Sequence, residues 1–282
     1  MVTTRISDLH INAKNTLKRA GIENYRFEAA VLLEHFFGIR SYEIANLGGK
    51  SVSPQAVEEL KGALEKRIQG YPLQYIVGEW EFFGLLFYVG EGVLIPRQDT
   101  ETLVEAVLER VTKTARIADL CSGSGCIAVT LEKKLPASVV YAVERSEAAL
   151  SFLSRNLQRN ASGVKLIRGD VLSEAVLNNF TELDVIVCNP PYVTDAEMDT
   201  LQQEVRFEPA MALEGGPDGL YFYREITSRW KGKLVKGGLL AYEIGAGQEF
   251  DVADILTANG FSELEFVRDL TGTVRVVTGT KL

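Results

Sequence analysis

The first quarter of the chain has its apolar residues spaced as in amphipathic helices. They recur every three or four positions in three groups: Leu9, Ala13, Leu17 and Ala20; Phe27, Ala30, Val31 and Phe37; Val57, Leu60, Leu64 and Ile68. Residues typical of helix starts and stops bracket the groups: Ser7 as N-cap and Gly21 as stop, then Gly38, Ser53-Pro54 and Gly70. This pattern predicts a small helical bundle.

Later in the chain the pattern changes to short apolar runs. Trp80–Val89 carries aromatic and branched residues followed by glycines, which predicts a β-hairpin. After Pro96, predicted strands alternate with predicted helices: strands at 116–120, 139–143, 164–168, 183–188, 239–244, 263–267 and 273–278; helices at 100–111, 125–135, 147–158, 220–230 and 250–259. Alternation with short links requires a mostly parallel, doubly wound α/β sheet.

The two final strands are joined by only Arg268–Gly272, which leaves no room for a helix and predicts an antiparallel hairpin. We therefore expect three parts: an N-terminal helical domain at 1–75, a β-hairpin linker at 76–96, and the α/β domain at 97–282. The helical domain is expected to recognise a macromolecular substrate. The alternative is that it only adds stability.

Composition limits the class of protein. The 282 residues are 46% hydrophobic, enough for a large domain plus a small one. No apolar stretch approaches the ~20 residues that span a bilayer, and residues 1–5 do not start a signal peptide, so we expect a cytoplasmic protein without a membrane partner. The net charge of −8 argues against binding duplex nucleic acid through a basic surface and favours a protein target.

Cysteine and histidine positions do not suggest metal or histidine chemistry. Cys121, Cys126 and Cys188 lie in or beside apolar runs without paired spacing, so we expect small buried side chains and no disulfide or metal site. His10 and His35, the only histidines, fall within the N-terminal helical pattern. Histidine-based catalysis is therefore not expected.

The apolar run at 183–188 leads directly into Asn189-Pro190-Pro191-Tyr192. Prolines cannot donate ladder hydrogen bonds, so the end of this strand can aim acceptor oxygens elsewhere. The Asn189 side-chain oxygen and the Pro190 carbonyl can each accept one N–H of a planar NH2 group, and Tyr192 offers a flat wall. Taken alone, the tetrapeptide is equally compatible with a strand followed by a proline turn.

A glycine-rich turn, Asp119–Cys126, follows the strand at 116–120. Gly123 and Gly125 let the backbone approach a ligand, and the helix that starts there favours an anionic group. The turn is not a P-loop, because no Lys-Ser or Lys-Thr follows it. It also lacks the third glycine of a dinucleotide fingerprint, because Ala128 stands there, and a plain tight connection is the alternative.

Two carboxylates end neighbouring strands. Glu144 lies about 20 residues beyond the glycines, where it can accept both hydroxyls of a ribose. Asp170 follows the next strand and can accept a hydrogen bond from an adenine amino group, or only cap its turn. Because open α/β sheets bind ligands at the carboxyl ends of their strands, these positions indicate a nucleoside pocket.

In this order, the glycine turn, the two carboxylates and the Asn-Pro-Pro-Tyr segment resemble the S-adenosylmethionine-dependent methyltransferases of the Rossmann-like class. The resemblance implies S-adenosyl-L-methionine as cofactor and S-adenosyl-L-homocysteine as product. The implied cofactor-binding residues are Asp119, Cys121, Ser122, Gly123, Ser124, Gly125, Glu144, Asp170, Val171 and Asn189. The Asn-Pro-Pro-Tyr form is typical of enzymes that methylate planar nitrogens: adenine N6, cytosine N4 or the glutamine amide.

A narrower resemblance covers nearly the whole chain. Ile95–Glu101, Glu204–Pro209 and Leu213–Leu220 are similar to segments of the release factor glutamine methyltransferase family. The resemblance implies N5-methylation of the glutamine in the Gly-Gly-Gln motif of class I peptide chain release factors, with no nucleic acid required. Three positions depart from the family's common residues: Gln98 for proline, Cys121 for glycine and Val171 for an aromatic residue.

For such a reaction, we expect Asn189, Pro190 and Tyr192 to act in catalysis, and the same residues with Pro191 to bind the substrate. Two fixed acceptors orient the amide lone pair and stabilise the charge that develops on nitrogen, so no strong base is needed. The segment 204–219 is expected to shape the substrate cleft.

Three questions stay open at this point. Arg97 and Glu101 are expected to stabilise the hairpin and the cleft wall, or to form an ion pair at a helix start. The first alternative function is an adenine-N6 methyltransferase acting on RNA or DNA. The second is a non-catalytic, cofactor-binding interaction module.

Overall fold

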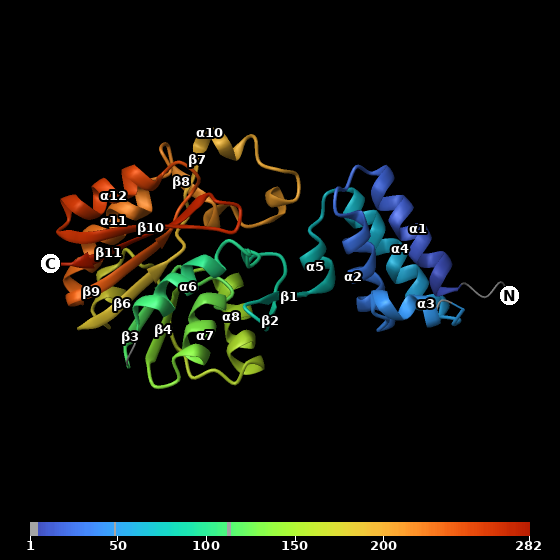
Figure 1. Cartoon of the computed structure of the whole chain (residues 1–282), viewed down its shortest axis with the longest axis horizontal. Helices are drawn as coiled ribbons and strands as arrows, with labels where there is room; N and C mark the ends of the chain where they lie inside the picture. Colours follow the sequence, from blue (N-terminus) through green and yellow to red (C-terminus); the bar gives the residue numbers. More distant parts are fainter. Residues whose placement is uncertain (1–4, 48, 112–113) are drawn as a thin grey trace. The chain divides into compact units, whose positions relative to one another are not determined.

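The computed structural model describes residues 5–47, 49–111 and 114–282. They divide into two compact units, which are coloured along the chain in Figure 1. The first unit contains the chain up to Gly78 and also Gln203–Phe207. The second contains Glu79–Gln202 and Glu208–Leu282.

The first unit is helical, as predicted. Its helices are α1 (Ile6–Arg19), α2 (Tyr25–Phe37), α3 (Ile44–Leu47), α4 (Pro54–Ile68) and α5 (Leu73–Val77), with a 3-10 turn at Ser41–Glu43. The Ser53 hydroxyl accepts the Ala56 N–H and caps α4, and Gly38 ends α2 in the left-handed conformation. The expected N-cap at Ser7 is wrong, because α1 already begins at the fully buried Ile6.

A seven-stranded sheet forms the centre of the second unit (Figure 1). Its strands are β3 (Arg116–Leu120), β4 (Val139–Glu144), β5 (Lys165–Arg168), β6 (Leu183–Cys188), β9 (Leu234–Glu243), β10 (Phe261–Arg268) and β11 (Val274–Lys281). They lie in the order β10-β11-β9-β6-β3-β4-β5, and β11 runs antiparallel to both its neighbours. The predicted parallel sheet with a terminal hairpin is confirmed. Strand order reverses direction between β3 and β6, so ligands are expected at the carboxyl ends of these strands.

Helices cover both faces of the sheet, because successive side chains along a strand point to opposite faces. In β6, Val185 and Val187 join one hydrophobic cluster, whereas Ile186 and Cys188 join the other. The first cluster includes α6 (Glu101–Arg110), α7 (Cys126–Lys134) and α8 (Glu147–Arg159); the second includes α9 (Glu174–Leu177), α11 (Tyr221–Trp230) and α12 (Glu249–Ala258). This is the doubly wound, Rossmann-like architecture expected from the sequence.

Short elements complete the second unit. The expected hairpin consists of β1 (Glu79–Phe82) and β2 (Leu85–Tyr88). A parallel pair, β7 (Val193–Thr194) and β8 (Glu214–Gly216), and the one-turn helix α10 (Asp195–Met198) were not predicted, because so few residues show no periodicity. Two 3-10 turns cover Ala210–Ala212 and Lys231–Lys233, whereas a third, at Val205–Phe207, belongs to the first unit.

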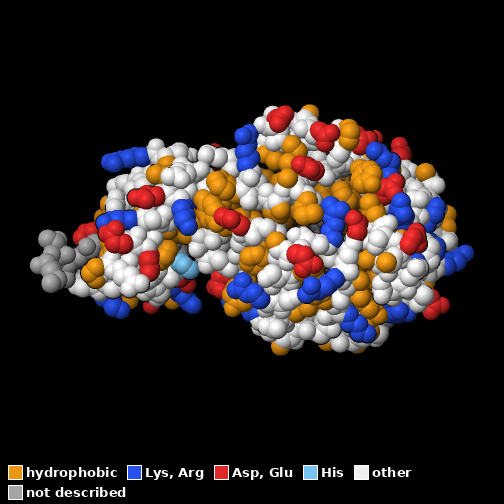
Figure 2. Space-filling view, turned by 180° about the vertical axis from the view of Figure 1, so that it is seen from behind, with side chains coloured by type: hydrophobic (Ala, Val, Ile, Leu, Met, Phe, Trp, Pro, Cys, Tyr) orange, Lys and Arg blue, Asp and Glu red, His pale blue; other side chains and the backbone are white. Residues whose placement is uncertain are grey.

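The surface agrees with the acidic composition. On the face shown in Figure 2, Lys and Arg side chains are scattered among Asp and Glu side chains. Within the described ranges, no helix is both long and apolar enough to cross a membrane.

Candidate active site

A pocket lies at the carboxyl ends of β3, β4, β5 and β6, where open α/β sheets bind their ligands. Nine of the predicted site residues line it: Cys121, Ser122, Gly123, Ser124, Glu144, Asp170, Val171, Asn189 and Pro191. The other four, Asp119, Gly125, Pro190 and Tyr192, lie outside its wall. Further wall residues include Gly92–Arg97, Thr100, Met211 and Phe222.

The glycine turn after β3 is folded tightly back on itself. Ser122 donates its backbone N–H to Val143 O at 3.0 Å and its hydroxyl to Asp119 O at 2.8 Å. Gly125 has φ +83°, and a Cβ there would overlap the Leu153 side chain, whereas a Cβ on Gly123 would meet nothing within 4 Å. The turn therefore presents its Gly123 backbone to open space in the pocket.

Cys121 adopts φ +60°, the left-handed conformation that glycine adopts at no steric cost. This accounts for glycine as the common residue at this position in the family that the sequence resembles. The side chain is half-buried on the pocket wall, so the expectation of a buried residue is wrong for Cys121, whereas Cys126 and Cys188 are buried. All three thiols are free.

Asp119 lies beneath the turn and is fully buried. Its Oδ2 accepts the Ala128 N–H in the first turn of α7, at 3.2 Å. Burial raises the pKa of the Asp119 carboxyl to about 8. Asp119 thus joins the turn to the start of α7 from below, and its expected contact with a cofactor stays a prediction.

Glu144 is held by three backbone donors. Its Oε2 accepts the Gly123 N–H at 2.8 Å, and its Oε1 accepts the Arg145 and Ser146 N–H groups at 2.8 and 2.7 Å. The residue is 8% exposed and lines the pocket. A carboxylate has about four lone-pair sites, two on each oxygen, so Oε2 can still accept one hydrogen bond from a ligand.

Asp170 and Val171 form the next part of the wall. Asp170 Oδ1 accepts the Leu172 N–H at 2.8 Å, which is the turn cap that the sequence left open, and Oδ2 pairs with Arg145 at 2.8 Å. Val171 is buried, and its carbonyl accepts the Trp230 indole N–H at 2.8 Å. An adenine contact by Asp170 stays a prediction.

The Asn-Pro-Pro-Tyr segment begins at the end of β6. Asn189 lies on the pocket wall, and its Nδ2 donates to the Thr100 hydroxyl at 3.4 Å. Two glycines pack closely against the Tyr192 backbone: a Cβ on Gly215 would lie 2.6 Å from Tyr192 Cα, and one on Gly219 would overlap Tyr192 O. Sequence reasoning missed these glycines, although they lie in a segment it expected to shape the cleft.

Thr100 and Glu243 were also missed. Glu243 ends β9 beside β6 and is 2% exposed. Burial raises the pKa of its carboxyl to about 7, while the neighbouring Thr100 and Asn189 side chains act to lower it. A carboxylate at the end of a predicted strand was the available signal, the same one that identified Glu144.

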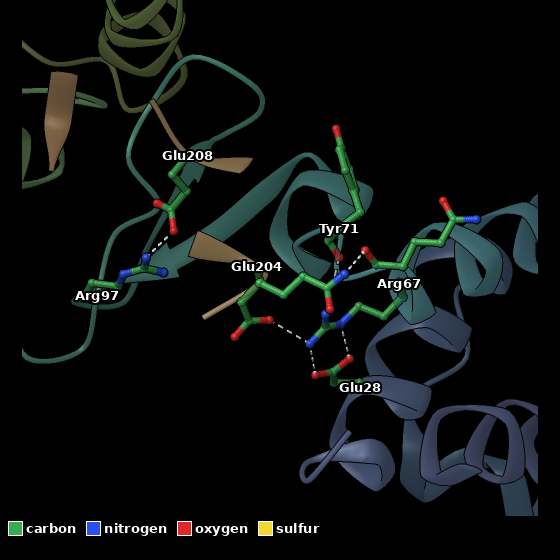
Figure 3. Close-up of polar contacts among 8 residues, drawn as sticks. Glu28, Arg67, Tyr71, Arg97, Glu204 and Glu208 are labelled. Atoms are coloured by element: carbon green, nitrogen blue, oxygen red, sulfur yellow. Dashed lines mark hydrogen bonds and ion pairs between the residues drawn. The ribbon is translucent and has the colours of Figure 1, made fainter. Parts of the chain in front are cut away.

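The wall segment before Thr100 is fixed by Glu208. This buried carboxylate accepts the Ile95 N–H at 2.9 Å and pairs with the Arg97 guanidinium, as Figure 3 shows. Glu101 accepts the Phe83 N–H at 2.7 Å and so supports the hairpin. Arg97 is therefore paired across the pocket wall and not with Glu101 at the helix start.

A second carboxylate network lies within the first unit (Figure 3). The Arg67 guanidinium forms two bonds to Glu28, at 2.7 and 3.0 Å, and one to Glu204 at 2.8 Å. Gln203 donates to the Gln69 carbonyl at 2.8 Å. Residues 203–207 thus belong with the helices, whereas the pocket wall receives residues from 209 onward.

Comparison with known proteins identifies both units. Residues 8–78 match the model of the PrmC N-terminal domain, and residues 97–216 match that of the methyltransferase small domain. A release factor glutamine methyltransferase from Geobacter sulfurreducens is 40% identical over 93% of this chain and 92% of its own. One from Clostridium botulinum is 34% identical over 98% of this chain and 99% of its own.

Solved structures agree on the fold. A 16S rRNA N2 G1207 methyltransferase from T. thermophilus, in complex with AdoMet and guanosine, matches with a TM-score of 0.52 at 18% identity, over 72% of this chain and 50% of that one. A Pyrococcus furiosus methyltransferase matches with a TM-score of 0.51 at 17% identity, over 71% of this chain and 90% of that one. With near full-length relatives at 34% to 42% identity, the chain belongs to the release factor glutamine methyltransferase family.

Proposed function

We propose that this protein methylates N5 of the glutamine side chain in the Gly-Gly-Gln motif of class I peptide chain release factors, with S-adenosylmethionine as methyl donor. Family membership supports the reaction. One structural observation carries it: the Asn189 amide, suited to holding a planar NH2 group, borders the same pocket as the Glu144 carboxylate, suited to holding a ribose.

The residues of the pocket fit the cofactor. Three backbone N–H groups fix the position of Glu144, and its Oε2 keeps a lone pair for a ribose hydroxyl. Gly123 offers its backbone to open space, and Asp170 and Val171 stand where the adenine ring is expected. When bound, S-adenosylmethionine supplies an electrophilic methyl group on a sulfonium. The protein's own residues must then orient the lone pair of the glutamine nitrogen towards this methyl group.

In this proposal, Asn189 Oδ1 and the Pro190 carbonyl each accept one N–H of the glutamine amide. The amide nitrogen is a poor nucleophile, because its lone pair is delocalised into the carbonyl. Two fixed acceptors favour the pyramidal geometry in which the lone pair is free, and they stabilise positive charge on the nitrogen. Pro191 fixes the segment, and Tyr192, cradled by glycines, packs along the glutamine side chain.

The partner is proposed on the same grounds. We assign recognition of the release factor to the N-terminal domain. Mixed surface charge and a net charge of −8 favour a protein target that needs no nucleic acid. Release factors act on cytoplasmic ribosomes, so we place this protein in the cytoplasm.

The test is to incubate the protein with labelled S-adenosylmethionine and a class I release factor, and to locate the label by mass spectrometry. We expect label on the Gly-Gly-Gln glutamine, and none on a factor carrying Gly-Gly-Ala. Label on RNA or DNA oligonucleotides without release factor would instead indicate an adenine-N6 methyltransferase. Cofactor binding without any transfer would indicate an interaction module.

The role of Asn189 has a separate test. Asn189→Ala should abolish methyl transfer, because one acceptor is lost, while the affinity for S-adenosylmethionine in calorimetry changes little. If cofactor binding disappeared with transfer, Asn189 would be a cofactor-binding residue and not an acceptor for the substrate.

A further inference from the structure

Glu243 is the last residue of β9, and Asn189 directly follows the last residue of the neighbouring strand β6. Strands β6 and β9 are parallel neighbours, and Cys188 is in register with Tyr242. The next residue on each strand is therefore Asn189 on one and Glu243 on the other. The register places a buried carboxylate beside the amide that borders the pocket.

Glu243 is buried without full compensation. It is 2% exposed, and its Oε2 has no hydrogen-bond partner within the described residues. The Arg275 guanidinium, whose charge acts on Glu243, is bonded to Asp269 at 3.0 Å and paired with Asp99 at 3.2 Å. A buried carboxylate without a full set of partners is costly to a fold.

Thr100 connects this carboxylate to Asn189. Its side chain is almost fully buried and its hydroxyl accepts the Asn189 Nδ2 at 3.4 Å. A hydroxyl that accepts from one neighbour can donate its single proton to another, and the buried Glu243 carboxyl, whose Oε2 has no partner in the described structure, is the acceptor next to it. When the ionised carboxylate accepts the Thr100 proton, the hydroxyl can only accept from Asn189, which requires the Asn189 NH2 group to donate, as it does here.

We infer that Glu243 is a positioning residue that sets the orientation of the Asn189 amide through Thr100. The inference rests on the proposed function, in which Asn189 Oδ1 receives the substrate N–H. With the NH2 end turned towards Thr100, Oδ1 faces the pocket. In the flipped amide, Oδ1 would meet the oxygen lone pairs of Thr100 and the NH2 end would face a substrate that offers only N–H groups, so binding in the reactive orientation would be lost.

The decisive comparison is between Thr100→Val and Thr100→Ser. The Val variant has the same shape but no hydroxyl, and kcat on the release factor is expected to fall about 10- to 100-fold. The Ser variant keeps the hydroxyl, and its kcat should stay within about two-fold of the wild type. Glu243→Gln, which can present either end of its amide to Thr100, should fall between the wild type and Thr100→Val.

Three further measurements separate positioning from general damage. Calorimetry should give all variants the same affinity for S-adenosylmethionine. Thr130→Val, which also removes a buried hydroxyl, one without a partner in the described structure, should leave kcat unchanged. The double variant Glu243→Gln/Thr100→Val should be no slower than Thr100→Val alone, because residues acting in one chain are not additive.

The outcomes distinguish this inference from the proposed function. If the wild type does not methylate the release factor, the proposed function fails and the inference falls with it. If the wild type is active and Thr100→Val matches it, only the inference is refuted. The inference would also be refuted if the fall in kcat of the double variant equalled the product of the two single falls, or if weaker cofactor binding accounted for the whole fall.

Discussion

Glu243 should make the folding stability of this protein depend on pH, and Glu243→Gln should remove that dependence. The folded-state pKa of this carboxyl is raised from 4.5 to about 7, mainly by burial. Between these pH values the folded protein holds a proton that the unfolded chain has released. Stability due to this group is therefore present at low pH and is lost as pH rises to about 7.

The shift corresponds to about 3 kcal/mol in total, of which about 2 kcal/mol falls between pH 5.5 and 8.5. Other charged and titratable groups act on Glu243: Asp99, Arg275, Tyr192, Tyr223, Cys126 and Cys188. They are present in both proteins, as is Asp119, whose raised pKa has the same sign. Their direct contributions therefore largely cancel when the variant is compared with the wild type.

The assay is urea unfolding of both proteins at pH 5.5 and 8.5. The free energy of unfolding of Glu243→Gln relative to the wild type should be about 2 kcal/mol more favourable at pH 8.5 than at pH 5.5. Equal differences at both pH values would refute the reasoning, because they would mean that Glu243 titrates alike in the folded and unfolded states. Thr130→Val, which alters a buried polar side chain that does not titrate, is the control, and its difference from the wild type should be the same at both pH values.

The remaining predictions concern binding and stability. Glu144→Gln replaces a carboxylate that is held by three backbone N–H groups with an amide, and it should weaken S-adenosylmethionine binding about 10- to 100-fold in calorimetry. Unchanged affinity would exclude Glu144 from the cofactor site. Gly125→Ala should lower the free energy of unfolding by about 1–3 kcal/mol, because its Cβ overlaps Leu153 at positive φ; a wild-type value in urea unfolding would contradict this. Arg67→Met should lower the free energy of unfolding by about 3–5 kcal/mol in urea unfolding, because it leaves Glu28 buried and unpaired. The control is Arg229→Met, which breaks the exposed ion pair of Arg229 with Glu225 and should change the free energy of unfolding little.

The sequence predicted those site residues that directly follow strands of the parallel sheet. Glu144 and Asn189 could be placed on one pocket because both follow strands of a parallel sheet, whose carboxyl ends meet at one edge. Glu243 ends a strand too, but only the pairing of β9 with β6 shows which residue it neighbours. Thr100 was harder to predict, because it precedes a helix and reaches the site only through the packing of α6 on the sheet.

The short elements could not be predicted for a different reason. β7 and β8 are held by close backbone approach at Gly215 and Gly219 to Tyr192, and such contacts leave no hydrophobic period in the sequence. The N-cap at Ser7 failed because burial of Ile6 outweighed the preference of a hydroxyl for the helix start.

The membership of Gln203–Phe207 in the helical unit changes how a truncated protein should be interpreted. A fragment that begins at Glu79 would keep this segment but lose Arg67, so Glu204 would lose its ion pair. The residue that follows the segment, Glu208, holds the pocket wall through Ile95 and Arg97. Inactivity of the fragment would therefore not measure release factor recognition alone, and point substitutions on the exposed faces of the helices in the intact chain are the cleaner route to that surface.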